Sequence, residues 1–343
     1  ISEPAPVRRQ SLMKTAMCWP REAAIIRSII RGRAGRSRTR RMVGGRVRRY
    51  QAMLEKSGIR AEDIAGIGID GQSWSAIPVD KNGEVLANTP IWMDTRAADI
   101  CEEVGRKVGE DRIFQVCGNP FKATYTTPKI LWYQRNLPEV YAHTYKILQS
   151  NSYIAYKLTG EMTQELSQGY GLHCFDMRKG VWDLDMCREL GIREDLLPDI
   201  YPSHAIVGGV TERLQGNVAF FPEHRWQQEP WMRPAEPWEP AWFIRERPRS
   251  RGGQAGGMSI CIDEYKADPR LILSYHAAAG QWILQGGTVG GGGVMRWMEQ
   301  QFGDYERSRK EELGKSSLTQ FNEIAEKVAP GSDGMVFFAV YVR

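Results

Sequence analysis

Two short stretches carry side chains that could bind a polar ligand. The first holds Gln72, Ser73 and Trp74, which follow IAGIGID, where isoleucines alternate with glycines as in a buried strand. Ligand sites of α/β proteins gather where strands end. The second stretch, WMDTR, contributes an aromatic face from Trp92 and a carboxylate from Asp94. A core position for the indole and a helix cap for the carboxylate are the structural alternatives.

A glycine cluster is the third candidate. The stretch GGQAGGMS precedes SICID, which has the pattern of a strand. Glycines let backbone amides approach an anion closely, so this cluster could bind phosphate. A loop without a ligand is the alternative. The residues concerned are Gly252, Gly253, Gly256, Gly257 and Ser259.

Local signals place the elements that must position these residues. Strand patterns alternate with helix patterns from residue 52 onward, which indicates α/β layers. Asn82 and Gly83 predict a tight hairpin. Gly160 is expected to end the helix NSYIAYKLTG, because glycine readily takes the left-handed conformation found after helices.

Two helix starts are also predicted. Asp94 or Thr95 is expected to cap a helix over RAADICEEVGRKV, since a short oxygen-bearing side chain satisfies free amides of the first turn. Thr127 followed by Pro128 is the same kind of signal for the helix PKILWYQRNL. Both helices therefore begin close to candidate site residues.

Length and composition limit the class of protein. A chain of 343 residues exceeds the roughly 250–300 residues of a single core, so two domains are expected. No apolar run approaches the ~20 residues of a membrane span, and a cytoplasmic protein without membrane contact is expected. The six cysteines form no C-x-x-C pair, which argues against a zinc site and a disulfide framework. The lone histidines His173, His204 and His276 are expected in core or surface positions.

The charge is concentrated in one segment. Residues 27–49 hold ten arginines and no acidic residue, so the rest of the chain carries +5 − 10 = −5. Such a run is typical of a solvated basic arm or a nucleic-acid-binding patch. Nucleic-acid binding through residues 27–49 is therefore an alternative function.

Several stretches together resemble a known family. GIGIDGQSWSAIPVDKNGEVLANTPIWMDTRA, GNPFKATYTTPKILWYQRNLPEVY, ILQSNSYIAYKLTGE, FDMRKGVWD and LLPDIYPSHAIVGGVT resemble, in order, the N-terminal half of the FGGY sugar kinases, the group of xylulokinase and glycerol kinase. Residues 252–343 resemble the beginning of the C-terminal half. The resemblance implies an α/β, actin-like ATPase fold of two ribonuclease-H-like domains, here incomplete, with sugar and ATP in the cleft between them.

The resemblance also implies roles. Gln72, Ser73 and Trp74 match the substrate motif, and Trp92 and Asp94 match a second sugar-facing motif. Many xylulokinases carry Met-His where this chain has Ser-Trp, so the sugar is not identified.

Further partners follow from the same resemblance. Tyr125 is a weaker sugar-binding candidate, and the cluster GGQAGGMS resembles the second phosphate-binding turn. The implied partners are a sugar or polyol, ATP and Mg²⁺, without nucleic acid or membrane. A homodimer is left open.

Parts of the family pattern are missing. The acidic phosphate loop, the aspartate motif that supplies the catalytic base, and the late glycine-rich segment are all absent from the sequence. The first two gaps coincide with residues 1–51 and 216–251, which are rich in arginine, proline and tryptophan. The chain is therefore divided into an aberrant segment 1–51, an N-terminal kinase domain 52–215, an aberrant segment 216–251, and the start of a C-terminal domain, 252–343, truncated.

A shift of translation by one base explains both gaps. Trp231 and Met232 can be encoded only by TGG ATG, which read one base out of step contains GAT, an aspartate codon. We expect these two residues to stand where the base aspartate belongs. Neither an indole nor a thioether accepts a proton at neutral pH, so the chain is expected to be inactive as written.

Three functions are thus under comparison. The first is a carbohydrate kinase by family that lacks turnover, and the second is a non-catalytic sugar-binding pseudokinase. The third is a basic nucleic-acid-binding protein. Residues 1–51 and 216–251 are expected to pack poorly, because no hydrophobic periodicity there matches a helix or a strand.

Overall fold

The computed structural model describes one long stretch of the chain and several shorter ones. These are residues 29–31, 35–38, 66–69, 71–211, 225–228, 249–252, 256–288 and 291–335. Within them, no helix combines the length and the apolar character that crossing a membrane requires. The candidate base residues Trp231 and Met232 and the candidate Gly253 lie outside these ranges.

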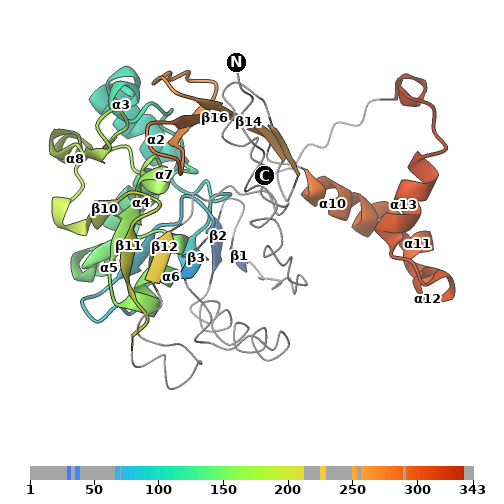
Figure 1. Cartoon of the computed structure of the whole chain (residues 1–343), viewed down its shortest axis with the longest axis horizontal. Coiled ribbons are helices and arrows are strands. Elements are labelled where there is room, and N and C mark those ends of the chain that lie inside the picture. The colour runs from blue at the N-terminus through green and yellow to red at the C-terminus, as the bar shows by residue number, and fades with distance from the viewer. Residues whose placement is uncertain are drawn as a thin grey trace, which may run out of the picture.

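A three-stranded sheet carries the first candidate loop. Strand β3 (Gly66–Ile69) pairs in parallel with β12 (Arg225–Gln228), which pairs antiparallel with β11 (Ile206–Gly209). Helix α6 (Ser150–Thr159) contacts all three strands, as Figure 1 shows. The GQSWS motif therefore leaves the end of β3 beside the start of α6.

Helices between residues 98 and 190 build the main core. It contains residues of α2 (Ala98–Val104), α3 (Glu110–Cys117), α4 (Thr126–Asn136) and α8 (Leu184–Leu190). Ile100, Ile113 and Ile130 are almost completely buried there, and full burial of such a side chain contributes roughly 1.5–3 kcal/mol. The other elements of this part are β4 (Ile77–Val79), β5 (Thr89–Pro90), α5 (Pro138–His143), β6 (Lys146–Leu148), β7 (Thr163–Glu165), α7 (Leu166–Gly169), β8 (Phe175–Asp176), β9 (Val181–Trp182) and β10 (Asp199–Tyr201).

The predicted hairpin and helix end are confirmed. Gly83 has a φ of 72°, and its amide donates to the carbonyl of Asp80 in the turn that connects β4 to Val85. A Cβ at Gly83 would also collide with the ring of Tyr156. Gly160 ends α6 in the left-handed conformation, with a φ of 85°.

The predicted helix caps are wrong. Helix α2 begins at Ala98 with Ala97 at the capping position, so neither Asp94 nor Thr95 caps it. Asp94 Oδ1 instead accepts hydrogen bonds from the backbone and side chain of Arg96.

The start of α4 also differs in detail. The helix begins at Thr126, with Tyr125 at its capping position, so Thr127 lies inside the first turn. The Thr127 hydroxyl accepts a hydrogen bond from the amide of His173 at 2.8 Å. The sequence suggested that this hydroxyl marks the start of the helix, but in the structure it bonds an amide from a distant part of the chain.

Short strands occur in both segments that were expected to pack poorly. In the first, β1 (Ile29–Arg31) pairs antiparallel with β2 (Gly35–Arg38), which continues to β5. In the second, β12 lies between β3 and β11. Backbone pairing is thus present in both segments, and the packing of their side chains stays a prediction.

A second sheet and a helical arm form the C-terminal part. The sheet has the order β13 (Arg249–Gly252), β14 (Gly256–Ile262), β16 (Trp282–Thr288) and β15 (Ile272–Tyr275), with antiparallel neighbours throughout. The arm extends to one side of the molecule in Figure 1. Its helices are α10 (Gly292–Phe302), α11 (Asp304–Ser308), α12 (Lys310–Leu313) and α13 (Ser317–Ala325).

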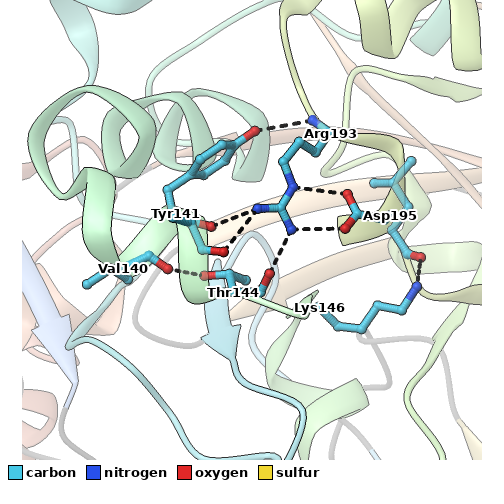
Figure 2. A network of polar contacts seen from close by, with 8 residues as sticks. Val140, Tyr141, Thr144, Lys146, Arg193 and Asp195 are labelled. Carbon is cyan, nitrogen blue, oxygen red and sulfur yellow. Dashed lines mark hydrogen bonds and ion pairs between the residues drawn. The ribbon is translucent and has the colours of Figure 1, made fainter.

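Arg193 joins the end of α5 to the segment after α8, as Figure 2 shows. Its guanidinium donates to the carbonyls of Tyr141, Ala142 and Thr144, and makes two further bonds to the carboxylate of Asp195. Arginine has five N–H donors, and all five have an acceptor here. The free carbonyls at the end of a short helix are thereby satisfied.

We predict that Arg193→Lys destabilises the fold. Lysine has three donors and no planar fork, so at least two of these bonds are lost, and the free energy of unfolding should fall by about 1–2 kcal/mol. Chemical denaturation followed by circular dichroism measures the change. Arg188→Lys is the matched control, because Arg188 is more exposed and its partners among the described residues are Asp185 and Glu194; its effect should stay within about 0.5 kcal/mol. Equal losses in the two variants would contradict the prediction.

Candidate functional site

The loop with the GQSWS motif lies against the first turn of α6. A Cβ atom at Gly71 would lie 2.6 Å from the amide nitrogen of Asn151, so only glycine permits this approach. The hydroxyl of Ser150 donates to the carbonyl of Gln72 at 2.5 Å. The path of the loop is therefore determined by α6 as well as by the end of β3.

Trp74 has an unusual backbone conformation. Its φ is 59°, in the left-handed region that bulky residues rarely adopt, at a cost of roughly 1–3 kcal/mol. Its amide donates to Oε1 of Gln149 at 3.0 Å, and its carbonyl accepts from Nζ of Lys129 at 2.7 Å. Because both partners are buried side chains, the conformation of Trp74 is held at its amide and at its carbonyl.

Lys129 connects this loop to the one before α4. Its ammonium also donates to the carbonyl of Thr124 at 2.5 Å. The side chain is completely buried, and burial lowers the pKa of Lys129 to about 7, although the nearby Asp94 carboxylate acts in the opposite direction. A single buried amine therefore donates hydrogen bonds to both loops.

Aromatic rings fill the space between the two loops. The rings of Trp74 and Tyr125 stack with centroids 4.2 Å apart and an angle of 25° between planes. Tyr170 meets both edge-on, at 5.8 Å and 6.3 Å. Trp92 packs against the same cluster, partly buried. The structure thus brings together the three aromatic residues Trp74, Trp92 and Tyr125 that the sequence nominated.

Several buried polar atoms beside this loop have no hydrogen-bond partner among the described residues. They are Nε2 of Gln72, Oγ1 of Thr126, and both side-chain polar atoms of Asn151 and of Gln168. A Cβ at Gly171 would contact both the Thr126 hydroxyl and the Trp74 ring, so that hydroxyl lies close to the indole. Buried groups of this kind are costly unless they find a partner.

Asp94 is fully buried and paired with Arg96. The guanidinium binds both carboxylate oxygens, at 2.7–3.0 Å. Arg96 in turn lies over the ring of Trp132, 4.8 Å from its centroid. The carboxylate is thus oriented by a cation, and it acts on Lys129 from the neighbouring loop.

The three histidines take core or surface positions, as expected. His173 is buried, its Nε2 lies 3.1 Å from the carbonyl of Pro120, and its ring lies 5.0 Å from that of Tyr125. Burial lowers the pKa of His173 to about 4, so this ring is neutral at physiological pH. His204 is exposed, and Nδ1 of His276 accepts from the amide of Ala278.

The glycine cluster forms a hairpin instead of an open loop. Gly252 ends β13 and pairs with Gly256 at the start of β14. Gly257 pairs with Gly287 on the other side, and a Cβ there would lie 3.0 Å from the carbonyl of Gly286. Ser259 lies further along the same strand and is buried. The described candidates of this cluster therefore lie on the paired strands β13 and β14 of the second sheet.

The described residues supply no obvious metal site. In these ranges, no group of three or more histidine, cysteine, aspartate or glutamate side chains is arranged to hold an ion.

Sequence reasoning missed the residues that hold the site together. Lys129, Gln149 and Arg96 were not among its candidates, yet each bonds a candidate residue. Lys129 could have been noticed as a lysine within the apolar helix PKILWY. Gln149 gives no such signal, because its partner lies 75 positions away.

Comparison with known proteins gives one family. The model of the N-terminal domain of the FGGY family of carbohydrate kinases matches residues 43–221. The chain is 30% identical to the xylulose kinase of Bacillus subtilis (strain 168) over 158 residues, which are 46% of this chain and 32% of that protein. It is 26% identical to the xylulose kinase of Lactococcus lactis subsp. lactis (strain IL1403) over 282 residues, 80% of this chain and 53% of that protein.

Solved structures agree on the fold. The ligand-bound xylulose kinase from Lactobacillus acidophilus superposes with a TM-score of 0.74 at 18% identity, over 91% of this chain and 61% of that one. The chain thus spans about a third to a half of the length of these two curated relatives, and under two thirds of this solved one. The fold is the actin-like ATPase fold expected from the sequence, present in part. The chain belongs to the FGGY family of carbohydrate kinases.

Proposed function

We propose that this chain is a carbohydrate kinase by descent that binds a sugar or polyol beside Trp74 and has no phosphotransferase turnover as written. The observation that supports sugar binding is the backbone conformation of Trp74. A tryptophan held in a left-handed backbone by two buried side chains is costly, and such strain is found mainly at functional sites.

The surroundings of Trp74 support a polyhydroxylated ligand. The indole face of the partly buried Trp92 can pack against a carbon skeleton, and the buried ring of Trp74 could do so after a small movement of its loop. The amide of Gln72 and the hydroxyl of Thr126 have unmet hydrogen-bonding capacity, which ligand hydroxyls could satisfy after a small movement of the loop. Ser73 lies on the loop of Trp74, and Asp94 lies on the loop of Trp92. The similarity to xylulose kinases favours a sugar of that size, and the substituted Ser-Trp pair leaves its identity to experiment.

The reaction of the family would transfer the γ-phosphoryl group of ATP to a ligand hydroxyl. The hairpin of Gly252 and Gly256 is our candidate for contact with the phosphates, because glycine has no side chain that would keep an anion from the backbone. Phosphoryl transfer depends on positioning, on charge stabilisation with Mg²⁺ and on a base for the hydroxyl proton. With Trp231 and Met232 at the place of that base, we propose binding without turnover.

A sugar-binding pseudokinase is the second candidate function. It is favoured by the same aromatic site, which needs neither the base nor the phosphate loop to bind a sugar. The two candidates differ in what the protein does with the ligand, and binding and turnover assays separate them.

We predict no sugar-dependent ADP release from the purified 343-residue chain. The assay offers ATP and Mg²⁺ with D-xylulose, gluconate or glycerol, the substrates that the names of the family relatives suggest. A gene in which both reading frames are restored, and which is extended to the length of the xylulose kinase relatives, serves as the positive control and should release ADP. Sugar-dependent turnover by the chain as given would refute the proposed inactivity.

We predict that Trp74→Leu weakens sugar binding by about tenfold, equivalent to about 1.4 kcal/mol. The substitution removes the aromatic face while keeping an apolar side chain of moderate size. Isothermal titration calorimetry with the same three compounds measures the change. Trp297→Phe, in helix α10 of the arm, is the control for loss of a tryptophan elsewhere and should bind normally. Unchanged affinity in Trp74→Leu would place the ligand elsewhere.

A further inference from the structure

We infer that Lys129 is a positioning residue whose buried amine clamps the two loops that carry Trp74 and Tyr125, and so shapes the sugar-binding surface. The inference rests on the sugar site proposed above. It assigns a role to a side chain that is completely buried.

The geometry of the clamp is specific to the stacked pair. Nζ of Lys129 bonds the carbonyl of Trp74 itself and the carbonyl of Thr124, the residue directly before Tyr125. One amine therefore fixes a peptide group next to each of the two stacked rings. If both bonds weaken, the two loops can separate, and the ring stack at 4.2 Å is the contact that reports it.

Other hydrogen bonds of the described residues do not duplicate the clamp. Gln149 holds the amide side of Trp74, but its other bond goes to the carbonyl of Gln168, in α7. Tyr133 donates to the carbonyl of Ala76, beyond the strained residue. Among the hydrogen bonds of the described residues, those of Lys129 are the ones that join the carbonyls of these two loops.

Protonation should tune the clamp. Burial lowers the pKa of Lys129 to about 7, and a charged donor makes hydrogen bonds roughly twice as strong as a neutral one. The charged groups that act on Lys129 are Asp94, which raises its pKa, and Arg96, which lowers it. The clamp should therefore be strong below about pH 7 and weaken above it.

Other titratable groups nearby can be separated from Lys129. Burial raises the pKa of Tyr125, Tyr133 and Tyr170, and it lowers the pKa of His173 to about 4, so all four stay neutral around pH 7. Glu165 is the exception, because burial raises its pKa to about 7, against the bonds from Ser167 and Ser203. Glu165 also acts on Tyr170, which touches Trp74.

The contribution of Lys129 to the stability of the fold should change with pH in the opposite direction to the strength of the clamp. The pKa of Lys129 is lower in the folded chain than in the unfolded chain, where it is close to 10.5. Between about pH 7 and that value the unfolded chain binds more protons, so the contribution of Lys129 to stability rises with pH. A clamp that weakens while stability improves cannot be explained by general unfolding.

The test compares near-ultraviolet circular dichroism of the wild type with that of Trp74→Leu, from about pH 6 to about pH 9. The difference spectrum isolates Trp74, and we expect it to shrink as pH rises through about 7. Sugar affinity, measured by calorimetry at the same pH values, should fall in parallel by a few-fold.

Three variants complete the experiment. Lys129→Met should show, at every pH, the small near-ultraviolet difference signal that the wild type shows at high pH, and it should bind sugar about tenfold more weakly. Lys129→Arg should keep a large difference signal that does not change with pH. Glu165→Gln should retain the pH dependence of the wild type. If Lys129→Met does not fold, the pH titration of the wild type against Lys129→Arg still decides.

The outcomes separate the two proposals. A pH-independent signal in the wild type, or loss of its pH dependence in Glu165→Gln, overturns the clamp. A pH-dependent signal without any sugar binding leaves the clamp in place and overturns the proposed sugar site.

Discussion

The left-handed backbone of Trp74 is the constraint on which the candidate site depends. A tryptophan does not adopt this conformation without compensation, and here Gln149 and Lys129 provide it by bonding its amide and its carbonyl. Because these partners come from α4 and from the start of α6, both helices must be in place before the loop can take its shape. The stacking of Trp74 on Tyr125 follows from that arrangement.

The same cluster continues into the second sheet. Leu273 and Leu284 are buried together with Trp74 and Tyr125. Asn119, which precedes Tyr125 on the same loop, bonds the amide and the carbonyl of Leu273 at 3.0 Å and 2.9 Å. Since β15 is an edge strand, this side chain occupies hydrogen-bonding positions that a further strand would use. The loop before α4 therefore contacts both the strained loop and the sheet with the glycine hairpin.

Sequence patterns predicted local features well and tertiary partners poorly. The turn at Gly83 and the end of α6 at Gly160 follow from glycine conformations that neighbouring residues do not alter. The predicted caps at Asp94 and Thr127 failed because distant or non-helical groups compete for the same oxygens: Arg96 takes the carboxylate, and the amide of His173 takes the hydroxyl. Trp74, Trp92 and Tyr125 were nominated as sugar-binding candidates through family resemblance and not through periodicity. The structure places all three in one aromatic cluster, and their role stays a prediction.

The sequence by itself determined the family, the alternation of strands and helices, and the aromatic character of the site, because these depend on residue types in order along the chain. It also led to the prediction that Trp231 and Met232 stand where the base belongs. Only the tertiary structure decided that a lysine is buried beneath Trp74 and that Asp94 is paired with Arg96. The bond from Lys129 to Trp74 joins residues 55 positions apart, so it can form only once α4 packs against the loop that follows β3.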